Sequence, residues 1–175
     1  MSTNHDKIII QGLRQNNLKN ISLEIPKEKI VVFTGVSGSG KSSIVFDTVA
    51  AESQRQMNET YSAWIRGRLE KYEKPKVDKI ENLSASVILD EPTTGLHASD
   101  IEKIMELLDG FVKRGNTVIV IEHNIDVMKQ ADYIIDVGPD GGTAGGQIVF
   151  AGTVADMVAN NDGITARYIR KDLNI

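Results

Sequence analysis

Residues 35–42 read Gly-Val-Ser-Gly-Ser-Gly-Lys-Ser, and this stretch decides the fold. The spacing is that of a phosphate-binding loop, in which glycines let backbone N–H groups approach phosphate oxygens where a Cβ would clash. The apolar residues 30–33 predict a buried strand before the loop, and the residues from Lys41 onward predict a helix after it. Because such a loop must leave a strand and open a helix, this context favours a nucleotide site over a glycine-rich turn with a stray lysine.

The helix that opens at this loop should direct the positive end of its dipole at bound phosphate. Lys41 should reach the β- and γ-phosphates, and the Ser42 hydroxyl can bind Mg²⁺. We therefore expect a nucleoside triphosphate and Mg²⁺ as cofactors, and the choice between ATP and GTP stays open because no base contacts can be identified. The residues expected to contact the nucleotide are Gly35, Ser37, Gly38, Ser39, Gly40, Lys41, Ser42 and Ser43.

The rest of the chain alternates short apolar runs with helical patterns, which predicts an α/β fold with a mainly parallel sheet flanked by helices. Two strands at 7–11 and 18–25 predict a small antiparallel part at the N-terminus. Buried strands are expected at 30–33, 86–89, 117–121 and 133–137, followed by a last strand at 147–150. Helices are expected at 42–57, 62–72 and 99–113, and Thr153 should cap the first of the terminal helices that follow it. An extended connector is expected at 73–82 and a turn-rich loop at 138–146. Ser99 and Glu102 have the spacing of a capping box.

Length and composition indicate a single domain of 175 residues with an ordinary globular balance of 41% hydrophobic and 25% charged residues. The formal net charge of −4 argues against a surface built mainly for nucleic acid. The chain has no cysteine, which excludes disulfides and thiolate zinc sites. Because neither an apolar signal core nor an 18-residue apolar run is present, we expect a cytoplasmic protein without a membrane segment.

An acidic pair follows the predicted strand at 86–89, where Asp90 and Glu91 come directly after Leu89. Phosphoryl transfer needs a carboxylate on the metal side and a group that orients or deprotonates the attacking water. We assign Asp90 to the metal, together with Ser42, and Glu91 to the base. Without the phosphate-binding loop nearby, the same pair would be read as a cap for the next turn.

The three histidines of the chain lie in different surroundings. His123 comes after the strand at 117–121, at the edge where the carboxyl ends of parallel strands meet, and we predict that it contacts the γ-phosphate. His97 lies in the loop before a helix, where a structural role and a functional role remain equally open. His5 has no assigned role.

Several stretches of the chain resemble a known family. Leu89-Asp90-Glu91-Pro92-Thr93-Thr94-Gly95-Leu96-His97, Val120-Ile121-Glu122-His123-Asn124 and Asp136-Val137-Gly138-Pro139 are similar to ABC-type ATPases of the UvrA family. That family comprises the damage-recognition ATPase of bacterial nucleotide excision repair and its drug-resistance relatives. The resemblance implies that residues 35–43 form Walker A, Asp90 and Glu91 form Walker B, residues 95–100 form the D-loop region, and His123 is the switch histidine. DNA is implied as a partner by the resemblance alone.

The chain also departs from this family. Family members carry two ATPase units in one long chain, whereas this sequence has one phosphate-binding loop. Residues 1–87 resemble the start of the first unit, and residues 88–175 resemble the end of the second. The Q-loop, the signature subdomain with its Leu-Ser-Gly-Gly motif and the cysteine zinc modules are absent. We therefore predict a seam near residues 87–90 within one ATPase domain.

Three functions follow from these observations. The first is a domain that binds Mg-ATP and hydrolyses it weakly, because the signature motif that completes such a site is missing. The second is a non-hydrolysing regulatory module that pairs with a second ABC unit, either another copy or a full-length UvrA-like partner. The third, a small-molecule kinase, lacks the arginine-rich lid that this chemistry needs.

Overall fold

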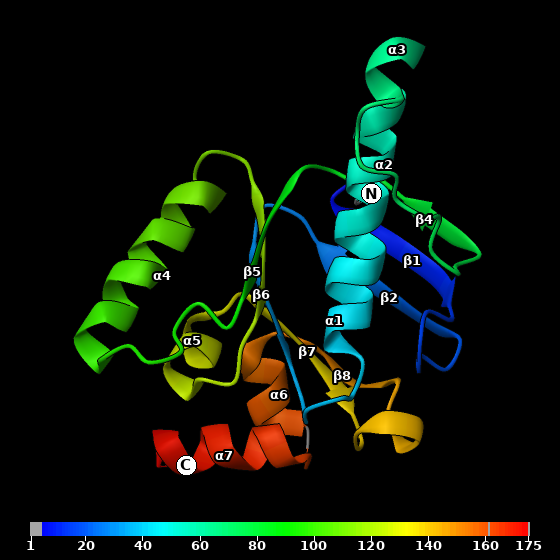
Figure 1. The fold of residues 1–175 in the computed structure, drawn as a ribbon. Coiled ribbons are helices and arrows are strands. Elements are labelled where there is room, and N and C mark those ends of the chain that lie inside the picture. Colours follow the sequence, from blue (N-terminus) through cyan, green and yellow to red (C-terminus); the bar gives the residue numbers. More distant parts are fainter. Residues whose placement is uncertain (1–4, 161, 175) are drawn as a thin grey trace.

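A five-stranded sheet forms the centre of the computed structural model, which describes residues 5–160 and 162–174 (Figure 1). The strand order is β5-β6-β3-β7-β8. The strands are β3 (Ile30–Thr34), β5 (Ser86–Asp90), β6 (Thr117–Ile121), β7 (Tyr133–Gly138) and β8 (Gln147–Gly152). The first four in the spatial order are parallel and β8 is antiparallel. The predicted α/β class with a mainly parallel sheet is confirmed.

A smaller antiparallel sheet combines β1 (Lys7–Leu13), β2 (Ile21–Pro26) and β4 (Lys79–Glu81) in the order β2-β1-β4. The antiparallel part expected at the N-terminus is therefore confirmed. The extended connector expected at 73–82 is wrong for residues 79–81, which pair with residues 9–11 of β1. Three residues are too short for a periodic pattern, so this strand depends on its partner rather than on its own sequence.

Strands β3 and β6 are buried along their whole length because helices cover both faces of the sheet. Alternate residues of each strand point into two separate cores, as the period of two requires. Val31 and Phe33 pack with the α1 side and with β1 and β2. Ile30 and Val32 pack with α4, α5, α6 and α7. Figure 1 shows α1 and α4 on opposite sides of β5 and β6.

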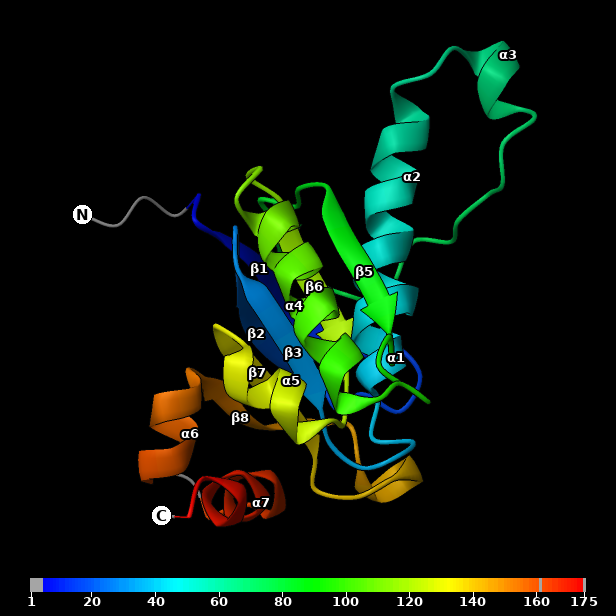
Figure 2. The same ribbon diagram turned by 90° about the vertical axis from the view of Figure 1, so that its left-hand side faces the viewer.

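The helix after the phosphate-binding loop is continuous, as predicted for 42–57, but contains a π-helical stretch. It consists of α1 (Lys41–Ile44), the π-helical Val45–Ala50 and α2 (Ala51–Glu59). The helix predicted at 62–72 is wrong beyond its first turn, since only α3 (Ala63–Arg66) forms. Its Trp64 is 68% exposed, and Figure 2 shows α3 projecting away from the sheets. A short helix with no packed face gains little stability in water.

The remaining helices are α4 (Ala98–Val112), α5 (Ile125–Gln130), α6 (Val154–Asn160) and α7 (Ile164–Leu173), with a 3₁₀ turn at Gly142–Ala144. The predicted helix at 99–113 is confirmed as α4. Its predicted cap is not, because His97 is the N-cap residue and its Nδ1 accepts a hydrogen bond from the Ser99 N–H. The predicted cap of α6 is confirmed, since the Thr153 hydroxyl accepts from the Asp156 N–H at 3.1 Å.

Strand β5 lies at the edge of the large sheet with β6 as its neighbour. Val87, Ile88 and Leu89 are half-buried, so the prediction of a fully buried strand at 86–89 is wrong in this respect. An edge strand has a neighbour on one side only, and hydrophobic periodicity does not distinguish edge from central strands. The seam near residues 87–90 stays a prediction.

Helix α4 allows a matched test of the core that supports this sheet. Leu108 is fully buried, whereas its neighbour Leu107 is 55% exposed. We expect Leu108→Ala to lower the free energy of unfolding by about 2–5 kcal/mol through lost burial and the cavity left behind. Leu107→Ala should change it by less than about 1 kcal/mol. Urea unfolding followed by circular dichroism measures both, and equal losses would contradict this description of the core.

Candidate functional site

The predicted phosphate-binding loop runs between β3 and α1, as its motif requires. Gly35 has a φ of 123°, and a Cβ there would lie 2.0 Å from the carbonyl oxygen of Val137. Gly40 has a φ of 113°, and a Cβ there would lie 2.7 Å from the Leu18 side chain. Both positions combine a left-handed backbone with close neighbours, so only glycine fits without displacement.

Lys41 is at the centre of the site, with 6% of its surface exposed. Its ammonium donates to the carbonyl oxygens of Gly35 at 2.9 Å and Val36 at 3.0 Å. Burial lowers the pKa of Lys41, and the negative charges of Glu91, Asp136 and Asp90 oppose that shift. The lysine of the loop therefore shares one electrostatic environment with the carboxylates of two different strands.

Hydrogen bonds from two neighbouring segments of the chain hold the phosphate-binding loop in place. The Asn17 side-chain amide donates to the carbonyls of Gly38 and Gly142, both at 3.0 Å. The Gly142 N–H also donates to the Gly38 carbonyl at 3.0 Å, and the Gly146 N–H donates to that of Ser39 at 2.9 Å. The turn at 14–17 and the glycine-rich segment 141–146 thus support the loop conformation through hydrogen bonds to its carbonyls. Sequence reasoning missed this role of Asn17.

The three serines after Gly38 differ in what they present to a ligand. Ser39 is fully buried, and its hydroxyl has no hydrogen-bond partner among the residues that the structure describes. Ser43 is buried too, and its hydroxyl accepts from the Asn16 amide at 2.9 Å. Ser42 is exposed at the start of α1. The hydroxyl predicted to bind the metal is therefore the accessible one.

Asp90, Glu91 and His123 come from neighbouring strands whose carboxyl ends meet at one edge of the sheet. Asp90 pairs with Ile121 at the end of β5 and is exposed. Glu91 has a φ of 43°, and its N–H donates to the Ile121 carbonyl at 2.9 Å. The His123 Nε2 lies 3.6 Å from the Glu91 Oε1. The structure thus brings the predicted base and the predicted γ-phosphate contact together.

Two buried carboxylates near the site were not predicted. Asp136, near the end of β7, is 7% exposed; burial raises its pKa, against a hydrogen bond from Thr165 and the charge of Lys41. Glu122, directly after β6, is 3% exposed. Asp136 interrupts the apolar strand predicted at 133–137 and Glu122 directly follows the apolar strand predicted at 117–121, and these positions are the signal that could have identified both. His97, by contrast, caps α4 and belongs to the fold.

In the part of the chain that the structure describes, protein side chains alone do not form a metal site. Within residues 5–160 and 162–174, no group of three or more His, Cys, Asp or Glu side chains has the geometry of a metal site. Mg²⁺ often keeps several waters and is held by one carboxylate together with the phosphates of its nucleotide. The exposed Ser42 hydroxyl and the exposed Asp90 carboxylate have the hard oxygen donors that suit that mode of binding.

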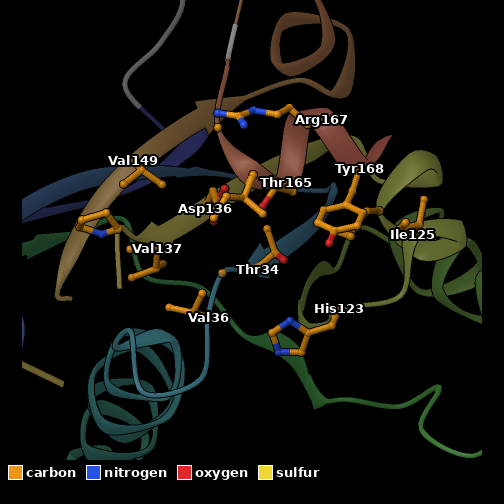
Figure 3. A pocket seen from close by; sticks show the side chains of 16 residues that line it. Thr34, Val36, His123, Ile125, Asp136, Val137, Val149, Thr165, Arg167 and Tyr168 are labelled. Carbon is orange, nitrogen blue, oxygen red and sulfur yellow. The ribbon is translucent and has the colours of Figure 1, made fainter. Parts of the chain in front are cut away.

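A pocket of about 570 Å³ opens beside the phosphate-binding loop rather than over it. Figure 3 shows Asp136, Thr165 and Thr34 grouped together, with Tyr168, Ile125, His123, Val36 and Val149 around them. The pocket shares Gly35, Val36 and His123 with the region described above. Ser37–Ser42, Asp90 and Glu91 do not line it, so the pocket includes only Gly35 and His123 of the predicted nucleotide contacts.

Comparison with known proteins agrees with the resemblance seen in the sequence. No protein-family model matches the chain. The UvrABC system protein A of Helicobacter pylori is 54% identical over 105 residues, which cover 59% of this chain and 11% of that protein. The chain thus spans about a tenth of the length of the curated relatives that it matches.

Two solved structures show the same fold. UvrA2 from Deinococcus radiodurans superimposes with a TM-score of 0.87 and 14% identity over 98% of this chain and 59% of that chain. An ATP-binding cassette protein, solved as a post-hydrolysis dimer with ADP and phosphate, gives a TM-score of 0.53 and 18% identity over 83% of this chain and 98% of that chain. None of the helices in the described residues is long and apolar enough to cross a membrane. The chain therefore resembles the UvrA family of ABC-type ATPases, in sequence over as much as 59% of its length and in fold over nearly all of it.

Proposed function

We propose that this chain is an ABC-type nucleotide-binding domain that binds Mg-ATP at the loop between β3 and α1 and hydrolyses it slowly. The observation that carries this proposal is Lys41, whose buried ammonium is held by the loop carbonyls and interacts electrostatically with the carboxylates at the end of β5. Phosphoryl transfer uses a lysine, a helix N-terminus and an acidic pair that lie together at one edge of a sheet.

The residues would divide the work as follows. The backbone N–H groups of the loop and the Lys41 ammonium bind the phosphates. Ser42 and Asp90 would hold Mg²⁺, which when bound neutralises charge on the phosphate oxygens. Glu91 orients and deprotonates the attacking water, and His123 contacts the γ-phosphate from the adjacent strand. The 3.6 Å separation between the His123 and Glu91 side chains supports action on the same phosphate.

Slow hydrolysis follows from an open half-site. Positioning and charge stabilisation supply most of the catalysis in phosphoryl transfer, and both need donors on every side of the γ-phosphate. Asp90, Glu91 and His123 are exposed in this structure, and the sequence has no Leu-Ser-Gly-Gly motif that a second copy could supply. We infer that two copies of this chain leave each other's sites incomplete.

A second candidate is a regulatory module that pairs with a UvrA-like partner through the D-loop region, residues 95–100. An ATP-binding cassette protein of the same fold was solved as a dimer, which supports pairing of this kind. Co-elution with a signature-bearing partner only in the presence of ATP would support this candidate, and monomeric elution with and without ATP would count against it. In either case, a role in DNA repair is a proposal taken from the family, and a cytoplasmic location is a proposal from the sequence. Any DNA affinity should fall steeply with salt.

Isothermal titration calorimetry with Mg-ATP tests the proposal directly. We expect saturable one-to-one binding, and a rise in the thermal midpoint that grows with ligand concentration because the ligand binds only the folded state. Mg-GTP titrated in parallel decides the base preference. Absence of heat and of a thermal shift with well-folded protein would refute nucleotide binding, whatever the rate of hydrolysis.

A further inference from the structure

Glu122 is a buried carboxylate that the proposed chemistry does not use. It accepts four hydrogen bonds, two on each oxygen. Oε1 accepts from the Thr93 N–H at 2.9 Å and from the Thr93 hydroxyl. Oε2 accepts from the N–H groups of His123 at 2.8 Å and Asn124 at 3.0 Å. The described residues provide no cation in salt-bridge contact with it, so neutral donors alone balance the charge.

These hydrogen bonds keep the carboxylate ionised. Burial by itself would raise the pKa of Glu122, but the hydrogen bonds from Thr93, Asn124 and His123 outweigh that effect and hold the pKa below its ordinary value. A carboxylate that accepts several backbone N–H groups is stabilised in its charged form. Hydrogen bonds to a charged group are stronger and more directional than those between neutral groups. Glu122 and its four hydrogen bonds from Thr93, His123 and Asn124 therefore form a rigid connection, the Glu122 joint.

The joint connects the two loops that carry the predicted chemistry. Thr93 lies two residues after Glu91, in the turn that follows β5, and the Thr94 N–H closes that turn on the Glu91 carbonyl at 3.1 Å. His123 follows Glu122 directly after β6. The Glu122 N–H also donates to the Phe33 carbonyl at 3.1 Å, which ties the same residue to the end of β3. One side chain thus sets the spacing between Glu91 and His123 at the end of the sheet.

We propose that Glu122 is a positioning residue that holds Glu91 and His123 in register against the terminal phosphate of the nucleotide. The inference rests on the proposed function, because it assigns a purpose to the geometry of that same site. With only 3% of its surface exposed, Glu122 acts through its neighbours rather than by touching the nucleotide. Its effect should therefore be confined to ligands that carry a γ-phosphate.

This restriction separates positioning from ordinary structural support. A residue that merely stabilises the fold would weaken binding of diphosphate and triphosphate ligands alike, because the loop around Lys41 binds both. A positioning residue should reduce the ratio of triphosphate to diphosphate affinity and leave diphosphate affinity intact. Adenylyl imidodiphosphate, which resists hydrolysis, and ADP are suitable probes, each with Mg²⁺.

The variants change either the donor, Thr93, or the acceptor, Glu122. Thr93→Val keeps the shape but loses the hydroxyl donor, whereas Thr93→Ser retains the donor and serves as the matched control. Glu122→Gln places an amide N–H₂ against N–H donors on one side of the joint. Measured by calorimetry, Thr93→Val should lower the affinity ratio about 5-fold and Glu122→Gln about 10-fold or more, in line with loss of hydrogen bonds to a charged acceptor. Thr93→Ser should stay within about 2-fold of the parent ratio, and all three should bind Mg-ADP within about 2-fold.

Each alternative outcome has a distinct signature. If Thr93→Val and Glu122→Gln keep the parent ratio, or if both ligands weaken equally, the positioning role is wrong. If the parent protein itself binds both ligands equally, the positioning role fails while nucleotide binding stands. If the parent binds neither ligand, the proposed function fails as well. Should Glu122→Gln not fold, as judged by circular dichroism, the Thr93 pair alone decides.

Discussion

Glu91→Gln should lower the slow turnover of Mg-ATP by at least about 100-fold and leave the dissociation constant within about 2-fold, because a general base contributes to the reaction and not to phosphate binding. The glutamine amide has the same shape as the carboxylate but cannot accept a proton from water. Binding should persist because the loop after β3 and Lys41 hold the phosphates, whereas Glu91 follows β5, two strands away in the order β5-β6-β3.

Turnover is measured as phosphate release under single-turnover conditions, where a slow enzyme gives a clear signal. Glu106→Gln is the matched control, since Glu106 is an exposed residue of α4 and lies outside the site. That variant should keep the parent rate. Undiminished phosphate release by Glu91→Gln would show that another group activates the water.

Lys41→Ala should weaken Mg-ATP binding by about 10- to 100-fold, the range expected for loss of a charge-assisted hydrogen bond to phosphate. The substitution removes the cation that faces the carboxylates of Glu91, Asp136 and Asp90. The remaining negative charges would then repel the triphosphate across a partly desolvated site. Both effects act in the same direction.

Calorimetry with Mg-ATP measures this loss, and Lys113→Ala provides the control because Lys113 is exposed at the end of α4. Lys113→Ala should bind as the parent protein does. A thermal melt of each variant distinguishes weakened binding from loss of the fold. Parent-like affinity in Lys41→Ala would mean that the phosphates are bound elsewhere in the molecule.

Several parts of the site were predictable because they lie on contiguous residues. The glycine spacing at 35–40, the apolar strand before it and the helix after it appear together in the sequence, and β3 and α1 confirm that order. Asp90 and His123 were placed by the rule that carboxyl ends of parallel strands share one edge, and the parallel pairing of β5, β6 and β3 satisfies it. Their functional roles stay predictions.

Other parts could not be predicted because they depend on partners distant in the chain. The arm around Trp64 has a helical pattern but no surface to pack against, so only one turn forms. Strand β4 exists through its pairing with β1. The burial of Glu122 and its bonds to Thr93 require β5 and β6 to be neighbours, and no local pattern specifies which strands are adjacent.

The sequence by itself determined the α/β class, the position of the phosphate-binding loop and the residue types available to it, because short-range sterics and hydrophobic periodicity act within one stretch of chain. Only the tertiary structure decided that Glu91 and His123 meet, that Asn17 braces the loop and that Glu122 joins two loops. These contacts follow from strand order and burial, which arise when distant segments share one core.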